Sequence, residues 1–499
     1  MIGRFKAVSS WWFAVACALA VLVVLACMPF GAAHAAGGFV AAQDDVTAAQ
    51  DDVTAGQEAA AETETHEPAS KVRIAEGAYT FNTALGKKLG CGLSGKSAKS
   101  GAQLALKKAA GQKSFYVRPE GQDRYSIQLV AEGLFLTEEG GKVVLRAWSG
   151  DEQQLWWATG GGSTGVSFVN VDSGNAISVA GGKAKSGAKL VAETFASKKA
   201  QRWKLTSKKL MSNGWYRLRS ALGTYLSVSG AGYKNGESVA AKKKSANGSQ
   251  CFQVKAVGSA YRIENARSFK SVAVKGGSKR EGADVVQQTS SKAKARLWKI
   301  SLDHRGRYVL LSAKSGKALS VKGDSRKSGA NVVQRGVDES KGQAWQFVSA
   351  NRYSLSGNKS LDRGIAKILA KHDTLKSAYT YVRDKMKWAD PDTAYRSGKY
   401  MSAANTKRYA KEMIKNGKGS CYCSSSLFMW LARGLGYKAK VTVGYMQSNT
   451  PGLVGAHSWV EVRKGGKVYV CDPDLGRAYP SRDWFMKLYK DAPAEYNFW

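Results

Sequence analysis

The chain has 499 residues, with 76 lysine and arginine side chains against 38 aspartate and glutamate, and a formal net charge of +38 at pH 7. This length is too great for one ordinary hydrophobic core, so several domains are expected. The seven cysteines are too sparse for a disulfide-stapled scaffold, and the positive charge predicts attraction to polyanions without identifying one.

The N-terminus has the order of a secretory signal peptide. Arg4 and Lys6 precede an apolar run over residues 11–30, and the small-residue site "AHA" follows at 33–35. We therefore predict a signal peptide over residues 1–35 and a secreted or cell-surface protein. Because the apolar run is nearly long enough to cross a bilayer, an uncleaved membrane anchor stays open as the alternative.

A short acidic region follows over residues 36–71. It contains "AAQDDVTAAQDDVTAGQEAAAETETHEPAS", in which a heptad is written twice and bulky apolar residues are almost absent. Such a composition cannot bury a core, so a disordered acidic linker is predicted. Residues 71–499 then carry 74 basic and 30 acidic side chains, which places the positive charge in the folded part.

Residues 72–350 repeat one unit six times, with a period of 43 to 48 residues. The first aromatic residues of the units are Tyr79, Tyr125, Phe168, Tyr216, Tyr261 and Tyr308. Within a unit, short alternating apolar runs are separated by turns rich in glycine, serine, asparagine and lysine, which predicts four strands. From this pattern alone, the six units form either one six-bladed propeller or two three-fold barrels.

The ends of the units share a motif. They read "QQLWW" at Gln153, "QRWKL" at Gln201, "QCFQV" at Gln250, "RLWKI" at Arg296 and "QAWQF" at Gln343. These endings resemble the Q-x-W signature of ricin-B-type lectin repeats, three of which close into a β-trefoil. The resemblance implies two all-β trefoils, over residues 72–207 and 208–350. It also implies that the tryptophans of these endings are core residues, namely Trp157, Trp203, Trp298 and Trp345.

The same resemblance implies a sugar pocket with an aspartate in the inner strand and an aromatic ring that stacks on the sugar. The aspartate positions hold Ser178, Ser227, Ala273 and Ser320, and only Trp148 and Phe195 offer nearby rings. Two ligands therefore stay open for the trefoils: a glycan, or an anionic cell-wall polymer held by lysines. No specific nucleic acid is expected, because the lysines lie in turns without interleaved aromatic residues.

The pattern changes to helices and strands in the last part of the chain. One helical face is predicted in "HDTLKSAYTYVRDKMKW", formed by Leu375, Ala378, Tyr379, Val382 and Met386. A second helix in "TKRYAKEMIKNGKG" should end at Gly417 or Gly419, and a third should begin at Cys421. Strands are predicted in "KAKVTVGY" and on both sides of the Gly465-Gly466 turn, followed by a polar tail.

Three residues in this region are candidates for nucleophilic catalysis. Cys421 stands at a predicted helix N-terminus, where partial positive charge favours a thiolate. His457 is the one histidine in a strand downstream of it, and Asp472 follows on the strand expected to pair back against that histidine. An aspartate so placed can orient one imidazole nitrogen and leave the other for the thiol.

The spacing of these residues resembles the transglutaminase-like superfamily, relatives of the papain-like cysteine peptidases. The resemblance covers residues 358–499 and implies an α+β catalytic domain. Arg433 and Gly436 follow Cys421 at the distances that the family shows, so the resemblance implies that Cys421 is the nucleophile and Cys423 a packing residue. It also implies that His457 and Asp472 complete the triad.

Two features of the site are not settled by the sequence. The second oxyanion donor could be Trp388, Tyr400 or Asn405. No cofactor and no metal is predicted, because Cys421, Cys423, His457 and Cys471 lack C-x-x-C spacing.

The predicted function is that of a secreted or cell-surface thiol-dependent acyl-transfer enzyme acting on a protein or peptide, directed to glycans or anionic wall polymers by the trefoils. A cysteine peptidase or amidase is slightly favoured over a protein-crosslinking transglutaminase by the breadth of the family. The alternative is a non-catalytic surface-binding protein with an inactive C-terminal domain.

Overall fold

The computed structural model describes residues 66–86, 88–130, 132–389, 402–447 and 454–498. The predicted signal peptide and nearly all of the predicted acidic linker lie outside these residues. No helix in the described ranges is both long enough and apolar enough to cross a membrane.

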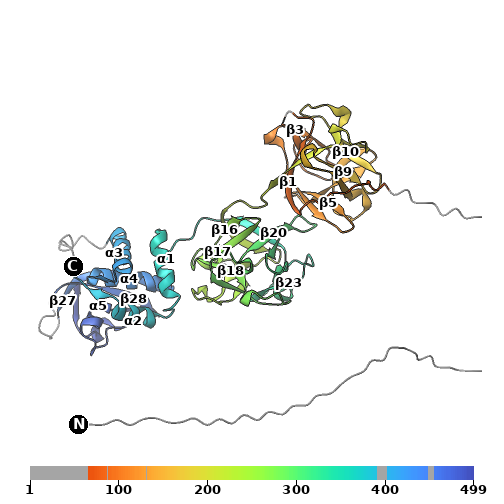
Figure 1. Cartoon of the computed structure of the whole chain (residues 1–499). Coiled ribbons are helices and arrows are strands. Elements are labelled where there is room, and N and C mark those ends of the chain that lie inside the picture. Colours follow the sequence, from red (N-terminus) through yellow and green to blue (C-terminus); the bar gives the residue numbers. More distant parts are fainter. Residues whose placement is uncertain (1–65, 87, 131, 390–401, 448–453, 499) are drawn as a thin grey trace, which may run out of the picture. The chain divides into compact units, whose positions relative to one another are not determined.

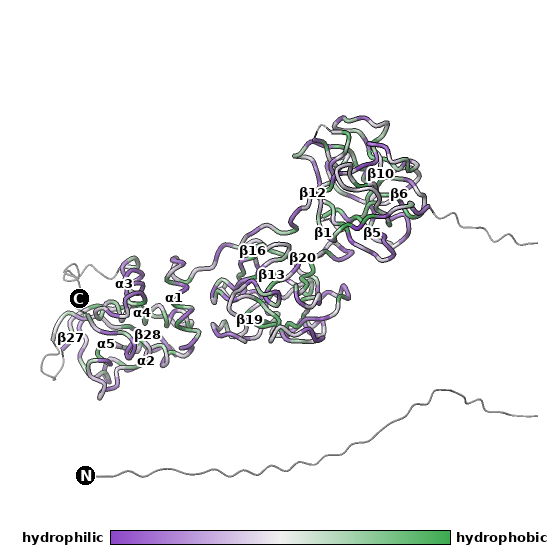
Figure 2. The backbone as a smooth tube through the Cα atoms, in the orientation of Figure 1, coloured by the Kyte–Doolittle hydropathy of each residue, from purple (hydrophilic) through white to green (hydrophobic). Residues whose placement is uncertain are grey.

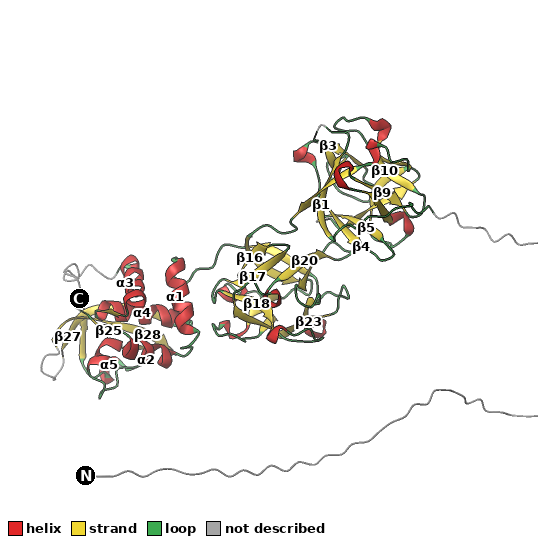
Figure 3. Cartoon of the chain, in the orientation of Figure 1, coloured by secondary structure: helices red, strands yellow, loops and turns green. Residues whose placement is uncertain are grey.

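The first β-region is a sheet of twelve strands (Figures 1 and 3). Its strands are β1 Gly77–Thr83, β2 Gly90–Leu93, β3 Leu104–Lys107, β4 Phe115–Pro119, β5 Arg124–Leu129, β6 Leu134–Glu139, β7 Lys142–Arg146, β8 Leu155–Gly160, β9 Val166–Asn170, β10 Asn175–Val179, β11 Leu190–Thr194 and β12 Trp203–Lys208. Strands β1, β4, β5, β8, β9 and β12 each pair with two others of this set and close a barrel. The strands between them form the hairpins β2–β3, β6–β7 and β10–β11.

The second β-region repeats this topology with twelve more strands. They are β13 Gly214–Ser220, β14 Tyr225–Val228, β15 Val239–Lys242, β16 Phe252–Val257, β17 Ala260–Asn265, β18 Lys270–Val274, β19 Val285–Thr289, β20 Trp298–Leu302, β21 Tyr308–Ser312, β22 Ala318–Val321, β23 Ala330–Arg335 and β24 Trp345–Ser349. Strands β13, β16, β17, β20, β21 and β24 close the barrel. A propeller blade would instead pair its four strands among themselves, so the two-trefoil prediction is confirmed and the propeller is excluded.

Tryptophans fill the trefoil cores as predicted, with one correction. Trp203, Trp298 and Trp345 are buried, and each indole N–H donates to a strand carbonyl 26 residues earlier in the chain. In the second repeat this position belongs to Trp156, whose indole donates to the carbonyl of Leu136. Trp157, the residue we expected there, lies in a separate small cluster with Trp148 and Phe195. Because successive side chains of a strand point to opposite faces, only one of two adjacent tryptophans can enter the barrel.

The short apolar strand segments alternate with hydrophilic turns along both trefoils (Figure 2). This alternation is what the repeat pattern predicted, because a barrel strand buries every second side chain and its turns face water.

The C-terminal part is an α+β domain. Its helices are α1 Lys359–Leu369, α2 Leu375–Lys385, α3 Ala403–Asn416, α4 Cys421–Gly434 and α5 Pro473–Ala478. A four-stranded antiparallel sheet has the order β29-β28-β27-β30, with bounds β27 Lys438–Gln447, β28 Val454–Lys464, β29 Lys467–Cys471 and β30 Glu495–Phe498. Two short strands, β25 Lys387–Trp388 and β26 Lys418–Gly419, pair in parallel.

The predicted elements of this domain are present. The five apolar residues predicted on one helical face are all buried, four of them in α2 and Met386 directly after it. Helix α3 ends at Gly417, which has a φ of 67° and caps the helix through its N–H to the carbonyl of Met413. Gly465 and Gly466 both have positive φ and join β28 to β29 in a two-residue hairpin.

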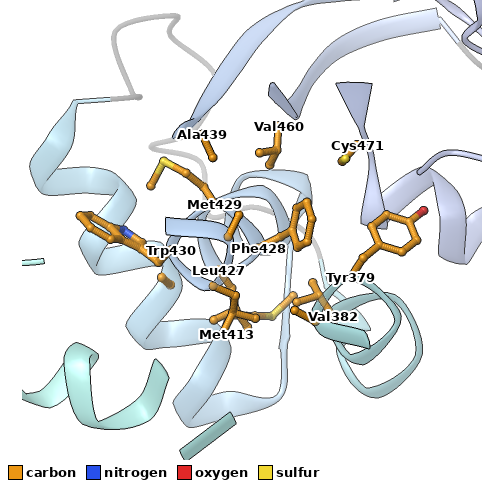
Figure 4. Close-up of a cluster of buried hydrophobic side chains, with 14 of the residues drawn as sticks. Tyr379, Val382, Met413, Leu427, Phe428, Met429, Trp430, Ala439, Val460 and Cys471 are labelled. Carbon is orange, nitrogen blue, oxygen red and sulfur yellow. The ribbon is translucent and has the colours of Figure 1, made fainter. Parts of the chain in front are cut away.

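Helix α4 lies at the centre of the domain. All its side chains from Tyr422 to Ala432 are buried. Figure 4 shows four of them, Leu427 to Trp430, among strand residues such as Val460 and helix residues such as Tyr379 and Val382. A helix that is apolar on nearly every side must be surrounded, so its first residue is held in place by the whole core.

The sequence interpretation missed five helices and strands of this domain, two of which are the short strands β25 and β26. Helix α1 was not predicted, and the polar tail contains both α5 and β30. Strand β30 pairs with β27 from Gly444↔Phe498 to Gln447↔Glu495, and so returns the C-terminal residues to the sheet that carries His457. That pairing is non-local, and local patterns do not report it.

Candidate active site

Cys421 is the first residue of α4 and is partly exposed. The other four described cysteines are buried, and all five thiols are free. Burial raises the pKa of the Cys423 thiol to about 11 and that of Cys471 to about 12. Of the described cysteines, only Cys421 therefore combines exposure with a helix N-terminus.

Cys423 packs against bare backbone, as the packing interpretation expected. A Cβ built on Gly419 would lie 2.8 Å from the Cys423 sulfur and 2.6 Å from its Cβ. The glycine thus lets the chain enter α4 directly over the buried thiol, and the two cysteines face different surroundings.

His457 lies on β28, beside the start of α4. The hydroxyl of Ser425 in α4 donates to the carbonyl of Ser458 at 2.8 Å, which ties the helix to this strand. His457 is 6% exposed, and its Nε2 is 2.7 Å from Oδ2 of Asp472. Nδ1 is then the nitrogen left for the thiol, and a ring nitrogen of His457 lies within 4.8 Å of the Cys421 sulfur. The structure therefore brings the three predicted residues together.

Asp472 is fully buried, and both its carboxylate oxygens and its backbone carbonyl form hydrogen bonds. Its Oδ1 accepts the N–H of Leu475 at 3.0 Å, so the same side chain caps α5. Its Oδ2 accepts the hydroxyl of Tyr496 at 3.0 Å, and Tyr379 donates to its backbone carbonyl at 3.1 Å. Tyr496, which β30 supplies, was missed by sequence reasoning because only three-dimensional pairing brings it here.

The charges of these groups favour a protonated imidazole. Burial opposes a charged ring, but the Asp472 carboxylate and Cys421 outweigh it and hold the pKa of His457 well above its ordinary value. The pKa of the Tyr496 hydroxyl is also raised, first by burial and then by Asp472, so it stays a donor.

A second carboxylate faces the thiol and the imidazole. Asp474 lies in the first turn of α5, is 7% exposed, and has an oxygen within 4.8 Å of both the Cys421 sulfur and a His457 ring nitrogen. Arg477 donates to its Oδ1 at 2.5 Å. Burial raises the pKa of Asp474, although His457 and Arg477 oppose the shift. The sequence interpretation missed this residue, yet "DPD" at residues 472–474 was the available signal.

The three candidates for the second oxyanion donor lie at different places relative to Cys421. Trp388 is paired with Gly419, two residues before Cys421, and is 52% exposed. Asn405 lies in the first turn of α3, and Tyr400 lies outside the described residues.

The positions that correspond to the family's sugar-binding aspartate are all buried in the trefoils. They are Ser178, Ser227, Ala273 and Ser320. The Ser178 hydroxyl donates to Glu193, and those of Ser227 and Ser249 bond to each other. The three serine hydroxyls therefore have partners within the protein, and Trp148 and Phe195 pack in their own cluster.

Protein-family models match both the trefoil region and the C-terminal domain. Five overlapping stretches, 111–193, 152–242, 199–288, 248–335 and 294–362, match the family model described as "Ricin-type beta-trefoil lectin domain-like". Residues 359–473 match the model of the "Transglutaminase-like superfamily". No curated protein gives a significant match to the chain.

Solved structures similar to this chain include a designed three-fold symmetric protein and two fungal lectins. ThreeFoil is 29% identical, with 28% of this chain and 100% of that chain covered and a TM-score of 0.27. The Rhizoctonia solani agglutinin is 18% identical, with 29% and 100% covered and a TM-score of 0.26. The Macrolepiota procera ricin B-like lectin, solved in complex with lactose, has the same identity, coverage and TM-score as the agglutinin.

The ricin-type matches together span residues 111–362, just over half of the chain. This protein therefore belongs to the ricin-type β-trefoil lectin domain-like family and carries a transglutaminase-like superfamily domain over residues 359–473.

Proposed function

We propose that this protein is an exported enzyme that transfers acyl groups through the Cys421 thiol. One observation carries the proposal: an accessible thiol at a helix N-terminus lies beside a buried imidazole, and the far nitrogen of that imidazole is held at 2.7 Å by a buried carboxylate. A nucleophile, a base and a group that orients the base are what such catalysis requires.

The chemistry follows from the roles of these residues. With the proton of Cys421 held on Nδ1 of His457, the thiolate sulfur attacks a substrate carbonyl carbon. His457 then protonates the departing amine as the carbon–nitrogen bond breaks, which leaves a thioester. Water or a second amine then gives a proton to His457 and attacks the thioester carbon, the carbon–sulfur bond breaks, and the proton on His457 returns to the Cys421 sulfur. Water as acceptor makes the protein a peptidase or amidase, and a lysine amine makes it a crosslinking transglutaminase.

The start of α4 also supports the negative charge of the tetrahedral intermediate. The first backbone N–H groups of an α-helix have no acceptor within the helix, so that of Cys421 can donate to the oxyanion. Trp388 is the candidate for a second donor, because its backbone pairs with Gly419, two residues before the nucleophile.

For the trefoils we propose attachment to glycans or anionic cell-wall polymers. The charge of residues 71–499 supports the anionic ligand, whereas the buried serines and alanine at the aspartate positions speak against a sugar pocket of the family's type. The protein or peptide substrate of the C-terminal domain would then be found at the cell surface.

The catalytic proposal is tested by labelling the full chain with iodoacetamide near neutral pH and mapping the modified cysteines by mass spectrometry. We expect modification of Cys421 alone, slowed at least about tenfold by His457→Ala. His372→Ala is the matched histidine control and Cys423→Ala the matched cysteine control, and both should leave labelling intact. An inert Cys421, or one that reacts equally without His457, would show a non-catalytic binding protein instead. Peptide and glutamine-donor substrates then identify the acceptor.

A further inference from the structure

Two carboxylates and one thiol lie around the His457 ring. The Cys421 sulfur and an Asp474 oxygen lie within 4.8 Å of a ring nitrogen of His457, and Oδ2 of Asp472 lies 2.7 Å from Nε2. Within the described part of the chain, Arg477 is the one lysine or arginine that forms a hydrogen bond with these residues, and its partner is Asp474. A cluster of sulfur, nitrogen and oxygen ligand atoms therefore lies at one point of a chain whose net charge is +38.

These donor types match a zinc site. A thiolate sulfur, an imidazole nitrogen and a carboxylate oxygen are the ligands that Zn²⁺ prefers, and three protein ligands leave the fourth position open. The three atoms lie within 4.8 Å of one another. Bond lengths of about 2.0 to 2.3 Å in a tetrahedral site place the ligand atoms roughly 3.3 to 3.7 Å apart. Side-chain rotations that move each ligand atom by about one ångström would therefore bring the three atoms to the distances of a zinc site.

His457 and Asp474 already have the hydrogen bonds to neighbouring residues that are usual for metal ligands. A histidine that binds zinc usually donates its other N–H to a carboxylate, and Asp472 receives Nε2 of His457 at 2.7 Å. A carboxylate ligand is usually hydrogen-bonded as well, and Arg477 occupies Oδ1 of Asp474, which leaves Oδ2 for a metal. The contacts that orient His457 toward Cys421 therefore also orient it toward a shared cation.

We propose that Cys421, His457 and Asp474 bind Zn²⁺ reversibly, and that the bound ion blocks the nucleophile. Binding forms sulfur–zinc, nitrogen–zinc and oxygen–zinc bonds, releases one proton from the thiol–imidazole pair and involves no oxidation or reduction. The thiolate and carboxylate together neutralise the ion. The binding step stands on the geometry alone, whereas the block rests on the proposed function.

Metal binding is tested with Co²⁺ as a spectroscopic substitute for Zn²⁺, added to the full chain. We expect a sulfur-to-cobalt charge-transfer band that Zn²⁺ removes and that is lost in Cys421→Ser. Asp474→Asn should weaken the affinity for the metal by about 10- to 100-fold or more, and Asp491→Asn, at an exposed position of the same domain, should leave it unchanged. Absence of the band, its survival in Cys421→Ser, or equal affinities in both aspartate variants would overturn the site.

The block is tested separately by iodoacetamide labelling of each variant with and without Zn²⁺, so that differences in basal reactivity cancel. Zinc at ten times its dissociation constant should slow labelling of Cys421 about tenfold, because only the metal-free fraction reacts, and a chelator should restore the rate. A cobalt band without protection from labelling would overturn the block but not the site. Failure of Cys421 to react even without metal would instead count against the proposed catalysis, while the cobalt titration still decides the metal site.

Discussion

At the scale of single residues, Asp472 links three parts of the C-terminal domain. One oxygen caps α5 and the other holds both the His457 ring and the Tyr496 hydroxyl. The orientation of the imidazole therefore depends on where α5 begins and on the pairing of β30. The sequence spacing predicted the His457–Asp472 contact, but it could not show the tyrosine that completes it.

We predict that Asp472→Asn removes the charge that raises the pKa of His457. A raised histidine pKa stabilises the fold fully below the unfolded-state value of about 6.5, and this contribution is lost as the pH rises through the folded-state pKa. The wild type should therefore exceed the variant in Tm most near pH 6, and the gap should narrow toward alkaline pH. Calorimetry across this range measures the gap.

Tyr496→Phe is the matched control for this change, because it removes a hydrogen bond to the same oxygen but keeps the carboxylate charge. Its difference in Tm from the wild type should depend much less on pH. If the gap between wild type and Asp472→Asn stayed constant or widened at alkaline pH, the charge of Asp472 would not be what raises the pKa of His457.

At the scale of elements, the sequence pattern predicted those helices and hairpins that are formed by interactions between neighbouring residues. The face of α2 and the hairpin β28–β29 could be predicted, because helical spacing and a Gly-Gly turn are written in neighbouring residues. Helix α1 has the same kind of signal, with buried Leu361, Ile365 and Leu369 after an Asn358 cap, and was overlooked beside the polar residues around it. Strand β30 has four residues and no local pattern, since pairing with β27 defines it.

The Q-x-W endings show where pattern reading slipped by one residue. In "QQLWW" only Gln154, Leu155 and Trp156 have the Q-x-W spacing, and the structure confirms Gln154 and Trp156 at these positions, one residue away from the Gln153 and Trp157 of our prediction. Gln154 is 1% exposed, accepts the N–H groups of Ser149 and Gly150, and donates to Thr137 and to the carbonyl of Ala147. The Gln154 side chain thus forms hydrogen bonds with the backbone of the turn at residues 147–150. The motif glutamine is therefore a structural residue and not a ligand contact.

This assignment predicts unequal effects for two adjacent substitutions. Gln154→Leu leaves several buried backbone and hydroxyl groups without partners and should cost about 2 to 4 kcal/mol of unfolding free energy. Gln153→Leu, which loses only an exposed contact to Asp172, should stay within about 0.5 kcal/mol. Urea denaturation followed by tryptophan fluorescence measures both. Equal losses would contradict the placement of Gln154 inside the fold.

At the scale of the whole molecule, the candidate site is assembled from segments far apart in the sequence. Motif spacing could identify Cys421, His457 and Asp472, because each belongs to a recognisable stretch. Asp474 and Tyr496 could not be assigned a role in this way, since their role depends on how α5 and β30 fold back to the imidazole. Likewise, the repeats predicted two trefoils, but which side chains stay available for a ligand depended on the burial of the serines in their inner strands.

The excess of positive charge over residues 71–499 makes attachment to an anionic polymer testable for the whole chain. Retention on purified cell wall should fall steeply between about 0.05 and 0.5 M salt, because the screening length shrinks from about 14 Å to about 4 Å. A simple sugar such as lactose should not release the protein. Replacing Lys243 and Lys244, which are exposed after β15, with glutamine should lower the salt concentration needed for elution. Retention that resists salt but yields to a sugar would favour a glycan as the trefoil ligand.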